Sequence, residues 1–368
     1  MWVFIVFTQL LTLLTSAILY WFIRPYRKVN KAAVLAVVFV VNNAALIYGL
    51  TEFWYERFHV YLVIGILQGF MLYAAALTAV GWLLNAQLFK YVWQPKQARG
   101  AASIVYVCIV GLAVFNAYSP VVHHLTVTTD KPLAEPMTIA LLSDTHLGRW
   151  FGNHQLDKLV RLVDSEQPDV VLIAGDIMND TTIAYDHHNM HEHLSKLDAP
   201  LGVYATLGNH DYRGYDKQIA QAVTAAGITV LDNQSVLLDD SVWLIGRSDD
   251  VDQSRLSAQA LLTQVDTEQP IVFLEHRPSM MDEISSLPID LHVAGHTHGG
   301  QIFPLTLLMR GLAPLHYGAK VVGETQFLVT SGYGFGPVPF RLGTRSEIWM
   351  ITLTRSDAVA EPSSQSAR

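Results

Sequence analysis

The sequence has a single cysteine, Cys108, and unusually few charged residues. Of its 368 residues, 15% are charged and 51% are hydrophobic, whereas a typical soluble domain has about 25% charged residues. One cysteine excludes a disulfide framework and a thiolate metal cluster. The scarcity of charge and the high mean hydropathy exclude a disordered chain, and they argue against a single soluble domain.

The charges that are present divide the chain into two parts. Residues 1–119 carry a net charge of +6, whereas residues 120–368 carry a net charge of −14. Proteins that bind nucleic acid need basic surface, because the phosphate backbone is anionic. The acidic second part therefore argues against a nucleic-acid partner.

Four apolar stretches without any charged residue fill the first part. They cover residues 2–23, 32–50, 60–89 and 101–118. A helix needs about 20 apolar residues to cross a bilayer, so residues 1–119 are predicted to form a transmembrane anchor of four helices. The first stretch lacks a basic leader and a cleavage site, which favours a retained helix over a cleaved signal peptide.

The charges of the connecting loops predict an orientation in the membrane. Seven basic residues lie in or beside the first and third loops: Arg24, Arg27, Lys28, Lys31, Lys90, Lys96 and Arg99. The second loop instead sets Arg57 against Glu52 and Glu56. Basic loops stay in the cytoplasm, so everything after Tyr118 is expected outside the cytoplasmic membrane of a bacterium.

The polar residues inside the apolar stretches are amides. They include Asn42, Asn43, Gln68, Asn85, Gln87 and Asn116. Ion and proton pathways usually need an ionisable side chain within the membrane. We therefore expect hydrogen bonds between helices and an anchoring role, with a role in lipid access left open.

From residue 137 onward, short apolar runs alternate with amphipathic segments, which is typical of buried strands in an α/β domain. Strands are predicted at 137–142, 170–174, 203–206, 229–231, 242–245, 271–274, 291–294, 327–330 and 348–353. Helices are predicted at 154–166, 185–197, 216–226 and 255–264. Residues 120–136 are expected to be a linker, 137–356 the α/β domain, and 357–368 a polar disordered tail.

Side chains that can bind metals follow five of the predicted strands. They are Asp144 and His146, Asp176, Asn209 and His210, His276, and finally His296 and His298. A single such Asp is more often a turn residue or a helix cap. Five strand ends in succession instead predict a site at one sheet edge. Carboxylate, amide and imidazole ligands together suit Mn, Fe, Zn or Co, and so many ligands predict two divalent ions.

The motifs D-x-H, G-D, G-N-H-D, a later lone His and G-H-x-H resemble those of the calcineurin-like metallophosphoesterases, over residues 137–354. The stretch GHTHGGQ is similar to the bacterial membrane-associated branch that includes UDP-diacylglucosamine hydrolase-like phosphodiesterases. The resemblance implies a layered α/β/β/α sandwich and hydrolysis of phosphoric esters that depends on metal.

The resemblance also implies a role for each matching residue. One ion is expected on Asp144, His146 and His298, the other on Asn209, His276 and His296, with Asp176 bridging both. His210 is implied to be catalytic and to lie beside the phosphate. The family often has an acid where this chain has Asn179, a position that is not a ligand. Asp211 is expected either to orient His210 or to cap the next helix.

Two divalent ions lower the pKa of water from about 15.7 toward 7 and bind phosphate oxygens. We therefore expect a membrane-anchored phosphoesterase in which a metal-bridging hydroxide attacks phosphodiester or pyrophosphate bonds, with lipid or cell-envelope substrates favoured. A phosphomonoesterase or nucleotidase is the alternative enzyme, and a metal-dependent membrane sensor is a third possibility. The apolar segment 301–320 either packs on its own domain or forms a lip that touches lipid.

Overall fold

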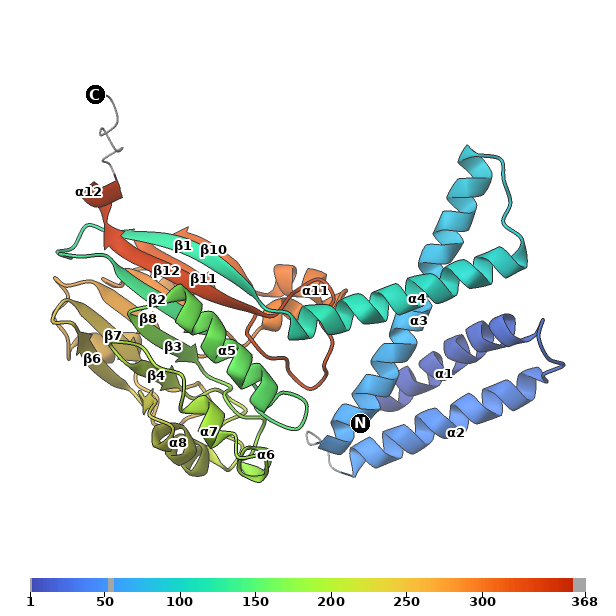
Figure 1. The fold of residues 1–368 in the computed structure, drawn as a ribbon, viewed down its shortest axis with the longest axis horizontal. Coiled ribbons are helices and arrows are strands. Elements are labelled where there is room, and N and C mark those ends of the chain that lie inside the picture. The colour runs from blue at the N-terminus through green and yellow to red at the C-terminus, as the bar shows by residue number, and fades with distance from the viewer. Residues whose placement is uncertain (1, 52–55, 360–368) are drawn as a thin grey trace. The chain divides into compact units, whose positions relative to one another are not determined.

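The computed structural model describes residues 2–51 and 56–359, which form two compact units (Figure 1). The helical unit comprises Met1–Phe115 together with Pro337–Phe340. The α/β unit comprises Asn116–Gly336 and Arg341–Arg368. Residues 52–55, which include Glu52 of the predicted second loop, and residues 360–368, which form most of the predicted tail, lie outside the described residues.

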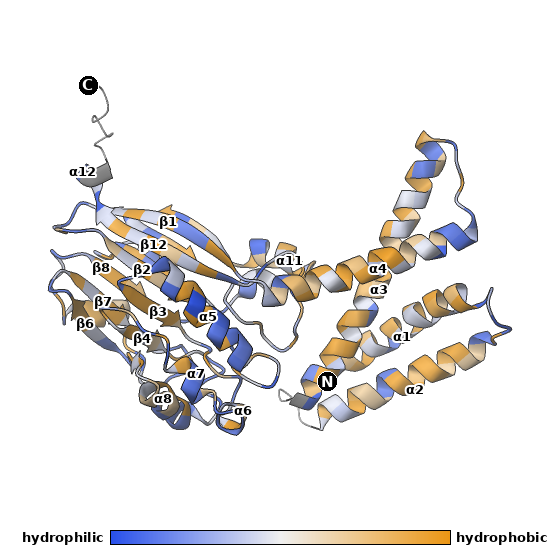
Figure 2. Cartoon of the chain, viewed as in Figure 1, coloured by the Kyte–Doolittle hydropathy of each residue, from blue (hydrophilic) through white to orange (hydrophobic). Residues whose placement is uncertain are grey.

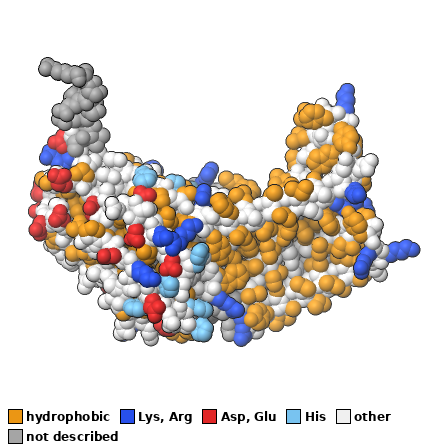
Figure 3. Space-filling view, in the orientation of Figure 1, with side chains coloured by type: hydrophobic (Ala, Val, Ile, Leu, Met, Phe, Trp, Pro, Cys, Tyr) orange, Lys and Arg blue, Asp and Glu red, His pale blue; other side chains and the backbone are white. Residues whose placement is uncertain are grey.

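The helical unit contains four long helices. They are α1 (Trp2–Ile23), α2 (Lys31–Leu50), α3 (Glu56–Leu88) and α4 (Pro95–Tyr118). All four are long and apolar enough to cross a membrane, as the apolar stretches predict. Figure 2 shows hydrophobic residues along most of their length, and Figure 3 shows hydrophobic side chains over much of their visible surface. Exposed apolar surface of this extent is typical of a membrane-embedded bundle.

Amide side chains connect α1, α2 and α3 inside this unit. The Asn42 Nδ2 group donates to Thr12 Oγ1 at 2.9 Å, and Gln68 Nε2 donates to Asn42 Oδ1 at 2.6 Å. Gln9 Nε2 similarly donates to Asn43 Oδ1 at 2.9 Å. The predicted hydrogen bonds between helices are therefore confirmed for Asn42, Asn43 and Gln68. Such bonds hold helices together where no water competes for the polar groups.

The last turn of α4 belongs to the α/β unit and not to the helical unit. Ala117 is completely buried in the core of the α/β unit. The Ser346 backbone N–H donates to the carbonyl of Asn116 at 2.9 Å. The ring of Tyr118 packs edge-on against Phe335, with centroids 5.3 Å apart. The last turn of α4 is therefore part of the α/β core.

The segment 120–136, expected to be a linker, instead contains a strand. Strand β1 (Val121–Thr129) pairs in parallel with β12 (Glu347–Arg355) over nine residues. Its burial alternates only weakly, because it lies at the edge of its sheet. Edge strands bury little of their surface and so leave a weak sequence signal, which explains the wrong prediction.

The α/β unit is built on two six-stranded sheets. The first sheet has the order β1-β12-β2-β3-β4-β5, with β2 (Met137–Leu142), β3 (Val170–Ala174), β4 (Val203–Thr206) and β5 (Thr229–Val230) all parallel. The second has the order β10-β11-β9-β8-β7-β6, and its strands are β6 (Gln234–Leu238), β7 (Val242–Gly246), β8 (Ile271–Leu274), β9 (Leu291–Ala294), β10 (Gly318–Val322) and β11 (Thr325–Val329). Strands β7, β8, β9 and β11 are parallel.

Alternating side chains place each sheet between two apolar layers. In β2, Ile139 and Leu141 face the core between the sheets, whereas Ala140 and Leu142 face a helical layer. That layer consists of α5 (Asn153–Glu166), α6 (Ile183–His187), α7 (His191–Leu194) and α8 (Asp216–Ala225). Helices α9 (Ala258–Leu262) and α10 (Met281–Ile284) cover the second sheet. The layered α/β/β/α sandwich is thus the fold of this unit.

Several element predictions differ from the structure in detail. The helix predicted at 185–197 is two short helices, α6 and α7, because Asn189 adopts a left-handed conformation (φ +51°) between them. Strands β6 and β10 were not predicted, and both lie at sheet edges. Helix α11 (Leu305–Leu312) forms in the apolar 301–320 segment, and α12 (Ser356–Val359) begins where the disordered tail was expected.

Candidate metal centre

Five loops carry all the predicted site residues. Three loops follow the neighbouring parallel strands β2, β3 and β4, and two follow β8 and β9 of the second sheet. Their side chains form three groups that could hold a metal ion, with ligand atoms within 4.8 Å of one another: Asp144, His146 and His298; His146, Asp176 and His210; Asp176, His276 and His296. The carboxyl ends of the strands therefore converge on one site, as open α/β sheets favour.

Pairs of imidazole nitrogens face each other within this site. His146 Nε2 lies 3.3 Å from His298 Nε2, and His276 Nε2 lies 3.2 Å from His296 Nδ1. His276 Nδ1 contacts the carbonyl of Ala174 at 2.8 Å, which leaves Nε2 directed at the site. Two neutral ring nitrogens repel each other unless a proton or a cation lies between them. A divalent ion with nitrogen and oxygen ligands fits this arrangement.

Asp176 lies between the two histidine pairs. Its Oδ2 is 3.5 Å from His146 Nε2 and 3.3 Å from His276 Nε2. Its Oδ1 accepts the backbone N–H of His210 at 2.8 Å, which fixes the carboxylate plane. One oxygen is thus held by the backbone while the other faces ligands from both groups. This is the position required of a bridging carboxylate.

Two buried oxygen atoms in the site accept no hydrogen bond from the described residues. They are Asp144 Oδ1 and Asn209 Oδ1. The other oxygen of Asp144 accepts from Ser143 Oγ at 2.6 Å and from the His296 N–H at 2.9 Å. Buried polar atoms in native proteins almost always have a partner. Both orphaned oxygens therefore fit the coordination of a metal ion.

The surroundings of the site shift the pKa values of its titratable groups in different directions. Burial raises the pKa of Asp144 to about 6, while burial and the charge of His276 lower the pKa of His296 to about 3. Burial also opposes the ionisation of Asp176, but the imidazoles of His276 and His146 hold its pKa well below the ordinary value. At neutral pH, Asp176 is therefore a carboxylate and His296 is neutral. Burial lowers the pKa of His276, but Asp176 raises it to about 10, so His276 must release its proton to bind a metal ion.

His210 has a partner that the sequence analysis missed. Its Nδ1 lies 2.6 Å from Asp180 Oδ1, and Arg213 Nη1 approaches the same oxygen at 3.2 Å. Burial alone would lower the pKa of His210, but the hydrogen bond to Asp180 and the charge of Asp176 raise it. The family often has an acid at the position of Asn179, and in this chain the next residue, Asp180, provides a carboxylate.

Asp211 has neither of the roles that the sequence predicts. Its carboxylate accepts the backbone N–H groups of Ile177 at 3.0 Å, Met178 at 2.9 Å and Gly208 at 2.9 Å. It therefore joins the loop after β3 to the loop after β4. This contact fixes the loops that carry Asp176 and Asn209, and it explains why Asp211 is completely buried.

The backbone of the site is held in strained conformations. Five non-glycine ligands have positive φ angles: Asp144 (52°), His146 (42°), Asp176 (50°), His296 (71°) and His298 (48°). Such conformations cost about 1–3 kcal/mol each and cluster at functional sites. Gly295 must be glycine for a different reason, because a Cβ there would collide with Ser143 Oγ and Asp144 Oδ2. The backbone conformations that position these side chains therefore lower the stability of the fold.

A buried arginine outside the sequence motifs supports His298. Arg341 is completely buried, and its Nη2 donates to the carbonyls of Ser331 at 2.6 Å and Gly334 at 2.7 Å. The same nitrogen lies 3.3 Å from His298 Nδ1. Groups that contact the far side of a metal ligand orient it. No sequence pattern singled out Arg341, because its contacts depend on tertiary folding.

Comparison with known proteins agrees with this geometry. Residues 137–300 match the calcineurin-like phosphoesterase family. The chain is 33% identical over 237 residues to a "Transmembrane protein with metallophosphoesterase domain" of Danio rerio, covering 60% of this chain and 54% of that protein. It is 30% identical over 224 residues to the "Uncharacterized metallophosphoesterase YkuE" of Bacillus subtilis (strain 168), covering 58% and 78%. The chain thus spans about half the length of the Danio rerio relative.

The solved structures that resemble this chain are distant. Purple acid phosphatase PPD1 from yellow lupin seeds is 12% identical, with a TM-score of 0.36, and the match covers 64% of this chain and 58% of that one.

Proposed function

This chain belongs to the calcineurin-like metallophosphoesterase family, and we propose that it is a membrane-anchored phosphoesterase with two divalent metal ions. The proposed reaction is hydrolysis of phosphodiester or pyrophosphate bonds in lipid or cell-envelope substrates. One observation carries the proposal: Asp176 belongs to two groups of metal ligands, and the His210–Asp180 pair lies beside it.

The residues divide between metal binding and proton transfer. In this proposal Asp144, His146 and His298 hold one ion, Asn209, His276 and His296 hold the second, and Asp176 contacts both. When bound, such ions supply the Lewis acidity that activates water and neutralises phosphate oxygens. The candidate metals are Mn, Fe, Zn and Co, because the ligand set mixes carboxylate, amide and imidazole groups.

His210 is the proposed general acid. Because Nδ1 contacts Asp180, the other ring nitrogen, Nε2, is left to act on the substrate. As the bond between phosphorus and the leaving oxygen breaks, the Nε2 proton passes to that oxygen and the imidazole becomes neutral. The raised pKa of His210 keeps the imidazole protonated nearer to neutral pH. The side chain is 19% exposed, which leaves it accessible to substrate.

A metal and substrate screen of the purified full chain tests this function. We expect EDTA to abolish hydrolysis, one of Mn, Fe, Zn or Co to restore it, and bis-p-nitrophenyl phosphate to be hydrolysed faster than p-nitrophenyl phosphate. Preference for the monoester would instead favour the phosphomonoesterase or nucleotidase alternative. Metal binding without hydrolysis of any phosphate ester would favour the sensor.

The α/β unit is proposed to lie outside the cytoplasmic membrane, on the basis of the loop charges. The test uses a Cys108→Ala background with a single new cysteine at Lys196 or at Lys28. The Lys196 side chain is 56% exposed in the α/β unit, and Lys28 lies exposed in the first loop. A membrane-impermeant maleimide added to intact spheroplasts should label Lys196→Cys and not Lys28→Cys. The reverse pattern would place the active site in the cytoplasm.

The apolar lip of the α/β unit supports a lipid substrate. We define it by five exposed side chains: Phe303 (43%), Leu305 (55%), Leu307 (52%), Leu308 (57%) and Leu312 (77%). Of the residues in α11, only Thr306 is buried, so most of this helix lies at the surface of the α/β unit, which favours the lip over packing on the domain. The preceding 3-10 helix η1 (His298–Gly300) begins at the proposed ligand His298. An apolar surface so close to the ligand fits an acyl chain or a bilayer.

Replacing both Leu307 and Leu308 with serine should slow hydrolysis of a lipid phosphodiester in vesicles about tenfold. Full insertion of a leucine side chain into lipid contributes about 1.5–3 kcal/mol, and partial insertion contributes less. The serine variants lose this contribution. Hydrolysis of bis-p-nitrophenyl phosphate should change less than about twofold. Ile183→Ser is the matched control, because Ile183 is 67% exposed outside the lip. Equal loss with both substrates would show that the lip supports the fold instead.

A further inference from the structure

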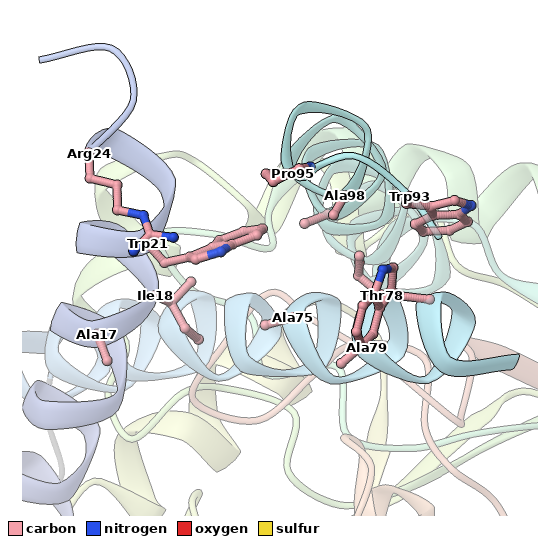
Figure 4. A pocket seen from close by; sticks show the side chains of 12 residues that line it. Ala17, Ile18, Trp21, Arg24, Ala75, Thr78, Ala79, Trp93, Pro95 and Ala98 are labelled. Carbon is pink, nitrogen blue, oxygen red and sulfur yellow. The ribbon is translucent and has the colours of Figure 1, made fainter. Parts of the chain in front are cut away.

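A cavity of about 500 Å³ lies within the helical unit between α1, α3 and α4 (Figure 4). Alanines on all three helices line it, and their small side chains leave the space open. The rings of Trp21, Trp82 and Trp93 also line it, and Arg24 lies at one end. A cavity that is mostly apolar with one cationic group is complementary to a molecule with an apolar chain and an anionic head.

The lining residues indicate the depth of this cavity in the membrane. Trp21 and Arg24 stand at the end of α1, and Pro95 and Ala98 stand in the first turn of α4. Figure 4 shows the Arg24 side chain beside the indole of Trp21, whereas Trp93, from the segment between α3 and α4, lies on the opposite side of the cavity. Tryptophan is enriched where helices leave the hydrocarbon core. The cavity therefore opens at the level where lipid headgroups lie.

Positive charge at this end of the helical unit has no acidic counterpart in the sequence around it. Seven basic residues lie here, and neither residues 1–51 nor residues 57–115 contain an Asp or a Glu. Arg99 is buried, with its Nε 3.1 Å from the Trp21 carbonyl and its guanidinium 4.8 Å from the Trp21 ring centre. Arg24 is exposed and pairs with no acidic side chain in the described part of the chain. Arg24 is therefore a basic group available to an anionic ligand.

We propose that this cavity binds an anionic phospholipid, with an acyl chain among the alanines and tryptophans and the headgroup phosphate at Arg24. Basic pockets between membrane helices bind anionic headgroups in this way. The cavity lies at the first turn of α4, whereas the α/β unit is joined to the last turn of the same helix. The bound lipid is therefore a component of the anchor and not the substrate of the metal centre.

Quenching of tryptophan fluorescence tests the proposal, because three tryptophans line the cavity. The full chain is placed in phosphatidylcholine nanodiscs with increasing dibrominated phosphatidylglycerol, or with dibrominated phosphatidylcholine as the neutral probe. We expect the anionic probe to quench at lower mole fraction than the neutral one. Arg24→Gln should weaken this preference about fivefold, as expected for one basic group near a headgroup.

Arg27→Gln is the matched control, because Arg27 lies in the same loop and does not line the cavity. It should leave the preference almost unchanged. Ala79→Phe fills the cavity and should reduce quenching by both probes, while hydrolysis of a soluble phosphodiester stays unchanged in all variants. Equal loss of preference in Arg24→Gln and Arg27→Gln would overturn the proposal in favour of a diffuse basic surface. Equal quenching by the two probes in the unaltered chain would overturn it as well.

Discussion

Replacing Asp176 with asparagine is expected to lower the metal content from about two ions per chain to about one or fewer, and to reduce turnover more than about 10³-fold. Asp176 shares one group with His146, a proposed ligand of the first ion, and another group with His276 and His296, proposed ligands of the second. Asparagine keeps the size of the side chain and an oxygen that can accept the N–H of His210. The variant removes the negative charge without removing the shape, so the fold should persist.

Elemental analysis of the purified variant, together with its rate on bis-p-nitrophenyl phosphate, measures this effect. His298→Ala is the informative comparison, because His298 belongs to one group only and should mainly empty one site. Asp164→Asn is the control for a change of charge, since Asp164 is exposed on α5. If Asp176→Asn retained a full complement of metal, the bridging assignment would be wrong.

The candidate metal-binding residues were predictable because each follows a buried apolar strand. Strands β2, β3, β4, β8 and β9 have the predicted bounds, since continuous apolar runs bounded by polar residues mark buried parallel strands. Once those strands are placed, parallel pairing brings Asp144 and Asp176 to the same end of the first sheet, and His276 reaches the site from the second sheet. The motif residues and the strand pattern therefore point to the same place, and the structure brings them together.

The residues that orient the ligands were not predictable in this way. Arg341 reaches His298 across 43 positions of sequence, from a loop with no periodic pattern. Asp180 meets His210 only because the loops after β3 and β4 are held together by Asp211. Both contacts depend on side-chain directions that arise after the sheets have packed. Sequence patterns report burial and local conformation, and neither determines these directions.

The apolar lip illustrates the same limit. The sequence shows that segment 301–320 is rich in leucine, and this pattern fits both a packed loop and an exposed surface. Only the structure shows that α11 buries Thr306 and turns Leu307 and Leu308 outward. An amphipathic helix whose apolar face points away from its own core is an exception to ordinary burial. The exception supports the proposed contact with lipid.

His210→Ala is expected to keep its metal content and to lose about 10²–10⁴-fold in kcat, the usual contribution of general acid–base catalysis. His210 also belongs to the middle group of potential ligands, so metal analysis separates the two roles. The matched control is His193→Ala, because His193 forms a similar pair with Asp157 at 2.7 Å on α7 and α5. Metal loss equal to that of a ligand variant would make His210 a ligand instead of an acid.

The pH profile of kcat and its dependence on the leaving group also test whether His210 is the general acid. A general acid works while it is protonated, so the rate should fall as the pH rises through the pKa of His210. The hydrogen bond to Asp180 raises that pKa. Asp180→Asn should therefore move the alkaline limb of the kcat profile to lower pH. His210→Ala should abolish that limb. Because an alkoxide needs the proton more than a p-nitrophenolate does, His210→Ala should slow an alkyl phosphodiester more than a p-nitrophenyl one. An unchanged alkaline limb in both variants, with equal loss on the two substrates, would assign the proton to a different group.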